Sequence, residues 1–199
     1  MDSLKNYKYI KNLLSQDLRE FITSSTLRSF DNVKADAKIP LSFAIHSSEM
    51  SIYRQLLHFV KPKIEVATKL TLLPIYAYSR FYLAGSSLFR HKDRPACEIS
   101  VSLTLTTKYD INKNYVWPLY MNDTPLNIKE GDAVVYRGRD VEHWRPVFEE
   151  ADGSWHHQVF LHYIDSNGPC TTLKEEINNR NRSFNEREQL RIEKREKLN

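Results

Sequence analysis

The sequence predicts a mainly β fold of the α+β kind, a double-sheet jelly roll with helices packed on one of its sheets. Two observations favour this class. From Leu72 to Asp165 the chain is rich in Tyr, Phe, Val, Ile and Thr, in short runs broken by Gly, Pro, Asn and Asp, as in strands joined by turns. Before Leu72, apolar residues recur instead at the spacing of amphipathic helices. Helices followed by a series of short strands suit a layered core.

The composition sets the broad class of the protein. A chain of 199 residues, 41% of them hydrophobic, is long enough to fold around one substantial core. The formal charge of +4 is a weak excess and gives little ground for a nucleic-acid partner. No apolar run approaches the roughly 18 residues of a membrane span, and the first residues lack the apolar core of a secretion signal. Two cysteines, Cys97 and Cys170, do not make a disulfide framework, so we expect a reduced, cytoplasmic protein.

Residues 1–71 form the expected helical lead-in, which packs on the core. Apolar residues at helical spacing predict a first helix over residues 10–22, and Phe43–His46 has the composition of a short strand. Ser47, followed by Ser and Glu, is typical of a helix start, because a serine hydroxyl accepts from the free amides of the first turn. Pro62 suits the first turn of a further helix, since proline lacks the amide hydrogen that this turn leaves unpaired.

Residues 72–168 form the expected core. Short runs of β-branched and aromatic residues between turn residues predict its strands. The expected strands are Ile75–Tyr82, Leu88–Lys92, Glu98–Thr106, Val116–Met121, Asp132–Tyr136, Val141–Arg145 and Trp155–Asp165.

The last of these strands has two chemically different faces, because successive side chains in a strand point to opposite sides. One face is the more polar and is expected to line a pocket; its residues are His156, Gln158, Phe160 and His162. The other face is the more apolar and is expected to pack in the core; its residues are His157, Val159, Leu161 and Tyr163.

Residues 169–199 have a third character, with many charges and few apolar residues. This composition predicts an exposed, charged helix or tail at the C-terminus. The sharper alternative is a helix that docks a partner or joins copies of the chain in a homo-oligomer.

The segment His91-Lys92-Asp93 indicates a metal site. Residues two apart in a strand share a face, so the imidazole and the carboxylate can reach one ion. His143 lies on a later predicted strand, which follows the turn at Gly131-Asp132. Two histidines and one carboxylate are the facial triad of non-haem Fe(II) proteins, which leaves coordination positions open. Residue type alone also allows zinc, or surface ion pairs between this segment and its neighbours Arg90 and Arg94.

Taken together and in this order, five pieces of the chain resemble the Fe(II)- and 2-oxoglutarate-dependent dioxygenase superfamily, and within it the prolyl-4-hydroxylase-like group. The resemblance covers nearly half of the chain, from about residue 74 to residue 165. The pieces are Tyr78–Gly85, His91–Ser100, Gly131–Gly138, Glu142–Arg145 and Gln158–Tyr163.

The resemblance implies a double-stranded β-helix, in agreement with the jelly roll expected above. It also implies an enzyme, an oxidoreductase in which His91, Asp93 and His143 are the iron ligands. Such a hydroxylase uses Fe(II), 2-oxoglutarate and O₂ to hydroxylate a C–H bond, and it releases succinate and CO₂. The expected substrate is an amino acid, a peptidyl residue or a small metabolite.

One departure from the family concerns the cation that binds the far carboxylate of 2-oxoglutarate. The family usually carries an Arg or Lys for this on the last core strand, but Trp155–Asp165 has neither, and His156 or Gln158 falls near the usual position. Arg145 shares a face with His143, and Arg80 shares one with Tyr82, so either guanidinium could substitute. We expect Arg145 first and Arg80 second; the competing interpretation of Arg145 is a salt bridge with Glu149. The resemblance further implies that Tyr82 hydrogen-bonds the co-substrate.

Several other polar residues are candidates for supporting roles. Glu98, Arg94 and His162 are candidates to contact substrate. Asp132, Glu142 and Gln158 are candidates to orient the ligand histidines through hydrogen bonds.

Two other classes of function stay open at this point. One is a non-enzymatic, cupin-like protein that binds a metal or a small ligand, which the missing cation on the last strand favours. The other is an interaction module whose function lies in the charged tail.

Overall fold

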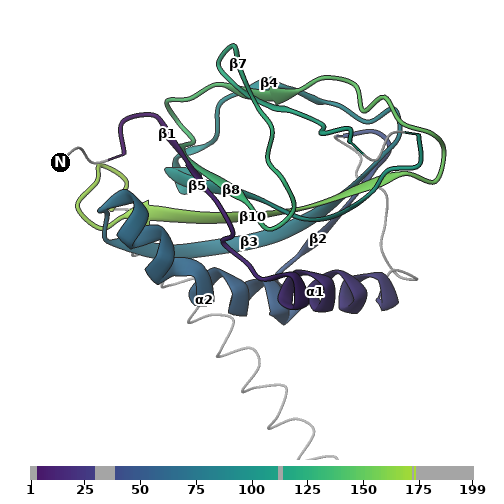
Figure 1. Cartoon of the computed structure of the whole chain (residues 1–199). Coiled ribbons are helices and arrows are strands. Elements are labelled where there is room, and N and C mark those ends of the chain that lie inside the picture. The colour runs from purple at the N-terminus through teal and green to yellow at the C-terminus, as the bar shows by residue number, and fades with distance from the viewer. Residues whose placement is uncertain (1–3, 30–38, 112–113, 172, 174–199) are drawn as a thin grey trace, which may run out of the picture.

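The fold is a jelly roll covered by helices on one side, as a computed structural model shows for residues 4–29, 39–111, 114–171 and 173 (Figure 1). Two antiparallel sheets face each other, and the helices lie on the outer side of the larger one. The predicted class is thereby confirmed. Neither helix of the described part is long and apolar enough to cross a membrane.

The larger sheet has six strands and the smaller one four. In spatial order the larger sheet is β1 (Tyr7–Ile10), β8 (Ala133–Arg137), β5 (Ile99–Lys108), β10 (Trp155–Asp165), β3 (Leu72–Leu83) and β2 (Ser42–His46). The smaller sheet is β4 (Leu88–His91), β9 (His143–Arg145), β6 (Leu119–Met121) and β7 (Thr124–Leu126). A 3₁₀ turn, η2 (Pro95–Cys97), separates β4 from β5. The strands predicted from the sequence are all present, with shifted ends.

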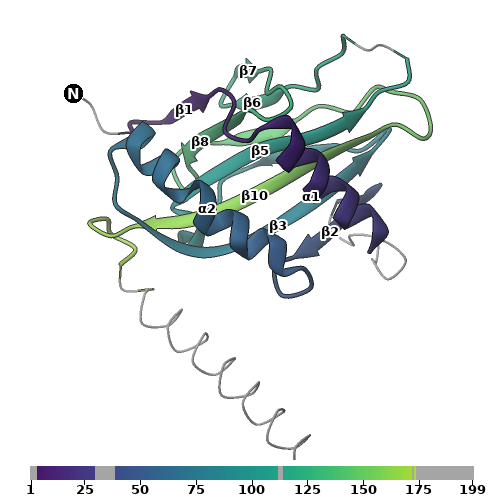
Figure 2. The same cartoon turned by 60° about the horizontal axis from the view of Figure 1, so that its bottom comes forward.

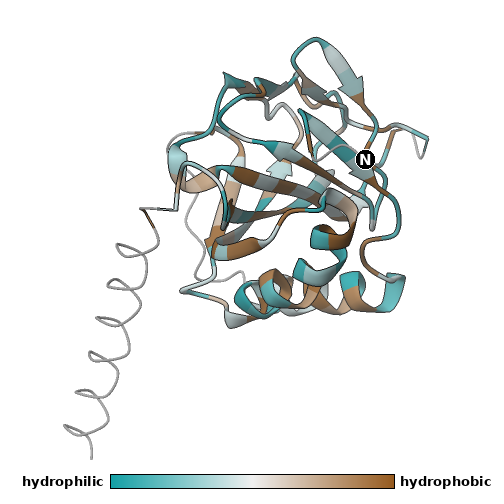
Figure 3. Cartoon of the chain, turned by 90° about the vertical axis from the view of Figure 1, so that its left-hand side faces the viewer, coloured by the Kyte–Doolittle hydropathy of each residue, from teal (hydrophilic) through white to brown (hydrophobic). Residues whose placement is uncertain are grey.

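Two helices, α1 (Gln16–Arg28) and α2 (Ser51–Thr68), cover the outer face of the larger sheet (Figure 2). They carry hydrophobic and hydrophilic residues on different sides (Figure 3), and the buried side packs on the strands. The main core therefore lies between the helices and the sheet. Its members include Leu13, Ile22, Leu56, Val60 and Ile64 from the lead-in, and Val101, Leu103, Val159, Leu161 and Tyr163 from the sheet.

The central strand β10 is paired along its length, with β3 on one edge and β5 on the other. Its two faces pack on different sides of the sheet, as the alternation predicts. Val159, Leu161 and Tyr163 belong to the core under the helices, whereas Phe160 belongs to a separate cluster between the two sheets. Register shifts next to His157 and His162 accommodate extra residues in the neighbouring strands.

The prediction of a helix over residues 10–22 was wrong for residues 10–15. Tyr7–Ile10 is a strand, because it completes the edge of the larger sheet by pairing with β8. Asn12 then turns the chain with a positive φ of 49°, and its amide donates to Asp132 Oδ1 at 2.7 Å. The helix begins only at Gln16, after Ser15 in extended conformation.

The predicted break between two helices at Pro62 was also wrong. The helix α2 runs through Pro62 without interruption, although proline supplies no amide hydrogen for the preceding turn. Its start also differs, because Ser47 and Glu49 lie in a turn after β2. There the Glu49 carboxylate accepts from the His46 amide at 2.6 Å, and the helix begins at Ser51. The expected strand over Phe43–His46 is confirmed as part of β2.

The predicted charged tail at 169–199, with its oligomer interface, falls largely on residues 172 and 174–199, which lie outside the described residues.

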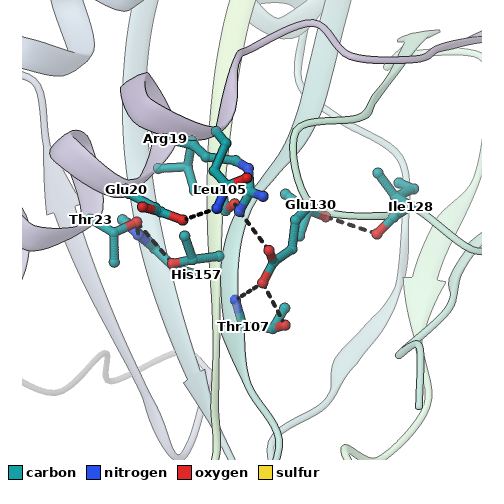
Figure 4. Close-up of polar contacts among 11 residues, drawn as sticks. Arg19, Glu20, Thr23, Leu105, Thr107, Ile128, Glu130 and His157 are labelled. Carbon is teal, nitrogen blue, oxygen red and sulfur yellow. Dashed lines mark hydrogen bonds and ion pairs between the residues drawn. The ribbon is translucent and has the colours of Figure 1, made fainter. Parts of the chain in front are cut away.

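Polar contacts join α1 to the larger sheet (Figure 4). Arg19 Nη1 lies 2.5 Å from Glu130 Oε2, and the other oxygen of Glu130 accepts from the Thr107 amide at 2.7 Å. Thr23 Oγ1 lies 2.9 Å from His157 Nδ1, under the helix. His157 is fully buried, so burial lowers its pKa to about 3.

The burial of His157 predicts acid sensitivity of the fold. In the unfolded chain His157 is protonated below about pH 6.5, whereas in the folded protein it is protonated only below about pH 3. The free energy of unfolding therefore decreases as the pH falls from about 6.5 to about 3. Replacing His157 with Asn should reduce the pH slope of the unfolding free energy by about 1.4 kcal/mol per pH unit between pH 6 and 4. Urea unfolding at several pH values measures this slope. Equal slopes for the two proteins would contradict the prediction.

Candidate metal centre

His91, Asp93 and His143 converge at one end of the space between the two sheets. The strands β4 and β9 bring the histidines together, because His91 and His143 are paired residues. Asp93 Oδ1 lies 3.9 Å from Nε2 of His91 and 3.8 Å from Nε2 of His143. An ion with bonds of about 2.0–2.2 Å, typical for imidazole and carboxylate ligands, fits between these three atoms.

The hydrogen bonds of the two histidines prepare them as metal ligands. His91 Nδ1 lies 2.8 Å from the Phe89 carbonyl oxygen, and His143 Nδ1 lies 3.1 Å from that of Val141. A carbonyl oxygen only accepts, so each Nδ1 carries the hydrogen and each Nε2 keeps its lone pair. Burial, with the neighbouring His91, lowers the pKa of His143 to about 4, so this ring is neutral at pH 7. The donor set therefore suits a divalent metal.

Asp93 is held by its side chain and its backbone. Ser100 Oγ donates to Oδ2 of Asp93 at 2.7 Å, which leaves Oδ1 for the histidine side. The Asp93 amide donates to the Gly138 carbonyl at 2.8 Å, and the Gly138 amide donates to Glu98 O at 3.0 Å. The turn after β8 thus positions the carboxylate that the β4 segment supplies.

Gly138 allows this close approach. A Cβ atom at this position would lie 2.5 Å from Asp93 Oδ2 and would also collide with the Cys97 carbonyl oxygen. Replacing Gly138 with Ala should therefore displace Asp93 and weaken Mn(II) binding, used in place of Fe(II), by about 10–100-fold. Isothermal titration calorimetry measures the affinity, and the exposed Asp140→Ala change in the same turn is the control. An unchanged affinity in Gly138→Ala would rule out this role.

A cavity of about 120 Å³ opens beside the triad. It is lined by Ile39, Tyr78, Arg80, Tyr82, Leu88, Phe89, His91, Asp93, Tyr136, His143, Phe160 and His162. Of the predicted site residues, the structure brings Arg80, Tyr82 and His162 to the same cavity as the triad. Arg80 is only 8% exposed, and its guanidinium carbon lies 5.6 Å from the ring centre of Tyr82. A buried arginine and three candidate metal ligands thus line the same cavity.

Arg145, Gln158 and His156 lie deeper between the sheets, in a buried hydrogen-bonded network. Arg145 donates to the Trp117 carbonyl at 2.6 Å and to Gln158 Oε1 at 3.1 Å. His156 Nε2 lies 2.7 Å from the same Gln158 oxygen and therefore donates to it, while Nδ1 accepts from Tyr109 OH at 2.7 Å. Within the described part of the chain Arg145 forms no ion pair, with Glu149 or any other carboxylate.

Burial lowers the pKa of Arg145, yet a guanidinium stays charged at neutral pH. Arg145 is 2% exposed and its acceptors are uncharged oxygens. Arg80 is the Cα partner of Gln158 across β3 and β10, so two cations flank this glutamine. Two buried arginines in the interior of the jelly roll favour an anionic ligand.

Two further candidates for substrate contact lie away from the cavity lining. The Glu98 carboxylate accepts from the Asp165 amide at 3.1 Å, and burial raises its pKa. Arg94 is exposed, with its guanidinium carbon 5.2 Å from the ring centre of Tyr76.

Two of the residues expected to orient the histidines have other partners. Asp132 accepts from Tyr9 OH and the Asn12 amide, and Glu142 pairs with the Arg90 guanidinium at 2.8 Å. Backbone carbonyls of β4 and of the segment before β9 orient the histidines instead. Ser100 and Gly138 were missed, because their roles depend on contacts between distant segments.

No protein-family model matches the sequence, and no curated protein is similar to it in sequence. Solved structures do match the fold. HygX from Streptomyces hygroscopicus, with nickel, 2-oxoglutarate and hygromycin B bound, has a TM-score of 0.64 at 10% identity, over 81% of this chain and 84% of that one. A viral collagen prolyl hydroxylase from Paramecium Bursaria Chlorella virus-1, in complex with 2-oxoglutarate, has a TM-score of 0.58 at 11% identity, over 80% and 96%.

A Pseudomonas putida prolyl-4-hydroxylase matches with a TM-score of 0.56 at 16% identity, over 79% of this chain and 92% of that chain. The chain has the fold of the 2-oxoglutarate-dependent oxygenases. The fold that the sequence resemblance implies is thus confirmed, and prolyl hydroxylases are among the proteins that share it. The oxygenase fold brings His91, Asp93 and His143 together from two strands of the smaller sheet and the segment after β4.

Proposed function

We propose that this protein is a non-haem Fe(II)- and 2-oxoglutarate-dependent oxygenase that hydroxylates a C–H bond. The observation that carries the proposal is the convergence of two histidines, one carboxylate and a buried arginine on a single cavity. In this proposal His91, Asp93 and His143 hold the iron through two Nε2 atoms and one carboxylate oxygen. Three protein ligands leave further coordination positions open for other ligands.

When bound, the iron and its co-substrate supply the oxidative chemistry, which uses O₂, releases succinate and CO₂ and transfers an oxygen atom to the substrate. The chain supplies binding and orientation. Phe89 and Val141 hold the ligand histidines in the required tautomer, and Ser100 holds the Asp93 carboxylate. These contacts orient the ligand side chains before a metal binds.

The cation for the far carboxylate of 2-oxoglutarate is, in this proposal, Arg80 rather than Arg145. Arg80 lines the cavity of the triad, whereas Arg145 is not part of its lining and donates to Gln158. A guanidinium binds a carboxylate with its charge and two parallel donors, which an amide or imidazole on β10 would not do. Tyr82, which also lines the cavity, is proposed as a hydrogen-bond donor to the same carboxylate.

The proposed substrate is a small molecule or a peptide side chain. The structural relative HygX has been solved with the small molecule hygromycin B bound, in keeping with small substrates for this fold. Four cavity residues, Tyr78, Phe89, Leu88 and Phe160, offer aromatic and apolar surface beside the triad. Phe89 is 62% exposed at the edge of this surface and is available to contact substrate.

The first test of this function is binding under anaerobic conditions. Fe(II) and 2-oxoglutarate together should produce a visible charge-transfer absorption, since the co-substrate chelates the metal. Admission of O₂ should then release succinate even without substrate, at a slow uncoupled rate. Metal binding without 2-oxoglutarate binding or succinate would overturn the proposal and favour a non-enzymatic, cupin-like binding protein.

A further inference from the structure

A second group of potential metal ligands lies next to the triad. It consists of Asp93, Cys97 and His162, whose ligating atoms all lie within 4.8 Å of one another. Cys97 ends the turn η2, and His162 comes from the central strand β10. Cys97 is 2% exposed and His162 is 3% exposed, so both side chains are buried. The proposed oxygenase function uses neither of them as a ligand.

The hydrogen bonds of His162 leave one nitrogen free to bind a ligand. Ser100 has a single hydroxyl hydrogen, and two oxygens that can only accept lie within reach of it, Asp93 Oδ2 at 2.7 Å and the Cys97 carbonyl oxygen at 3.2 Å. His162 Nδ1, at 3.0 Å from Ser100 Oγ, therefore carries a hydrogen and donates it. Nε2 then keeps a lone pair, and this atom is buried without a hydrogen-bond partner in the described part of the chain. Buried polar atoms are nearly always satisfied, so this orphan nitrogen itself indicates a missing ligand.

Burial raises the pKa of the Cys97 thiol, so a metal ion or another cation beside the sulfur is needed to stabilise the thiolate. The sulfur of Cys97 is free of any disulfide and lies 2.9 Å from Tyr76 OH. The ring of Tyr76 also stacks on His162 with centroids 4.4 Å apart, so one tyrosine holds both candidate ligands. The guanidinium carbon of Arg94 lies 5.2 Å from the centre of the Tyr76 ring, and the positive charge of Arg94 acts to lower the pKa of the Cys97 thiol.

We propose that Asp93, Cys97 and His162 form a second metal position, selective for a thiophilic divalent ion such as zinc. A thiolate, an imidazole and a carboxylate are a donor set typical of zinc, whereas iron(II) suits the triad without sulfur. Binding releases the thiol proton to solvent, and a water molecule completes the four ligands. Both positions use the Asp93 carboxylate, so we expect an ion in the second position to compete for it with an ion held by His91 and His143. Zinc in this position therefore inhibits the oxygenase.

Cobalt(II) spectroscopy tests the second position without any catalytic readout. Titration of the full-length protein with Co(II) should produce a thiolate-to-cobalt charge-transfer band in the near ultraviolet, which the triad alone cannot give. Cys97→Ser should abolish the band. Cys170→Ser should keep it, because the sulfur of Cys170 lies near Arg139 Nη1 at 3.1 Å and not at the site. His91→Ala should also keep the band, since it removes only a ligand of the triad.

The outcomes separate this proposal from the oxygenase function. Absence of the band in the unmodified protein, or its survival in Cys97→Ser, would overturn the second position whatever the enzyme does. Native circular dichroism spectra of Cys97→Ser and Cys97→Ala would exclude misfolding as the cause of a lost band. If succinate release is observed, zinc should inhibit it, and Cys97→Ser should raise the inhibition constant by at least about 10-fold. Equal inhibition of both proteins would mean that zinc acts at the triad alone.

Discussion

Replacing His143 with Ala is expected to lower 2-oxoglutarate-dependent succinate release by at least about 100-fold. In the proposed site His143 supplies one of the three protein ligands, from a ring that is 3% exposed and fixed by the Val141 carbonyl. No other described side chain can take its place on β9, because its neighbours there are Trp144 and Arg145. Alanine also leaves a small cavity rather than a clash, so the fold should survive.

Two measurements separate loss of chemistry from loss of folding in this variant. Anaerobic titration with Fe(II) and 2-oxoglutarate should lose the visible charge-transfer absorption, while the circular dichroism spectrum stays native. His58→Ala is the matched control, since His58 is exposed on α2, on the far side of the larger sheet from the triad. If His143→Ala released succinate at a rate within a few-fold of the unmodified protein, His143 would not be a metal ligand.

Replacing Arg80 with Gln is expected to raise the 2-oxoglutarate concentration needed for half-maximal binding by about 30-fold. A hydrogen bond between charged groups contributes about 1.5–3 kcal/mol, and 2 kcal/mol corresponds to about 30-fold in affinity. Glutamine keeps two donors and much of the volume, so the change removes mainly the charge. Anaerobic titration of the Fe(II)-loaded protein, followed by visible absorption, measures the effect without turnover.

Arg145→Gln is the informative comparison for the arginine prediction. Arg145 donates to the Trp117 carbonyl and to Gln158, so its loss should destabilise the fold by about 1–3 kcal/mol and weaken 2-oxoglutarate binding less than Arg80→Gln does. Urea unfolding measures the first effect. A larger loss of affinity in Arg145→Gln would instead make Arg145 the anchor, in the order that the sequence indicates.

The parts of the fold that the sequence predicts well are those with a local periodic signal. Alternation along Trp155–Asp165 separates the two faces of β10, although only Phe160 and His162 of the polar face line the cavity. The His-x-Asp spacing identifies two candidate ligands that the structure brings to His143. Tyr7–Ile10 was missed because its strand character comes from pairing with β8, more than 120 residues later. Propensity gives no signal for such distant pairing.

The supporting residues of the site are harder to predict for the same reason. Gly138 matters because the carboxylate of Asp93 passes beside it, and Ser100 matters because it faces that carboxylate from the next strand. Facing direction is periodic and therefore predictable for Arg80 and Arg145. How deep an arginine lies between the sheets cannot be predicted in this way. For Arg145 it depends on its contacts with Trp117 and Gln158.

The position of β10 between the helices and the cavity limits how this chain can evolve. A slip of one residue in its register would turn Val159 and Leu161 into the polar cavity and would bury Gln158 and His162 against α1 and α2. Both the stability and the site would be lost together, so insertions and deletions in this strand should be strongly selected against. New substrates are therefore accessible mainly through changes of length in the loops and through substitutions at exposed cavity positions such as Phe89, which leave that register intact.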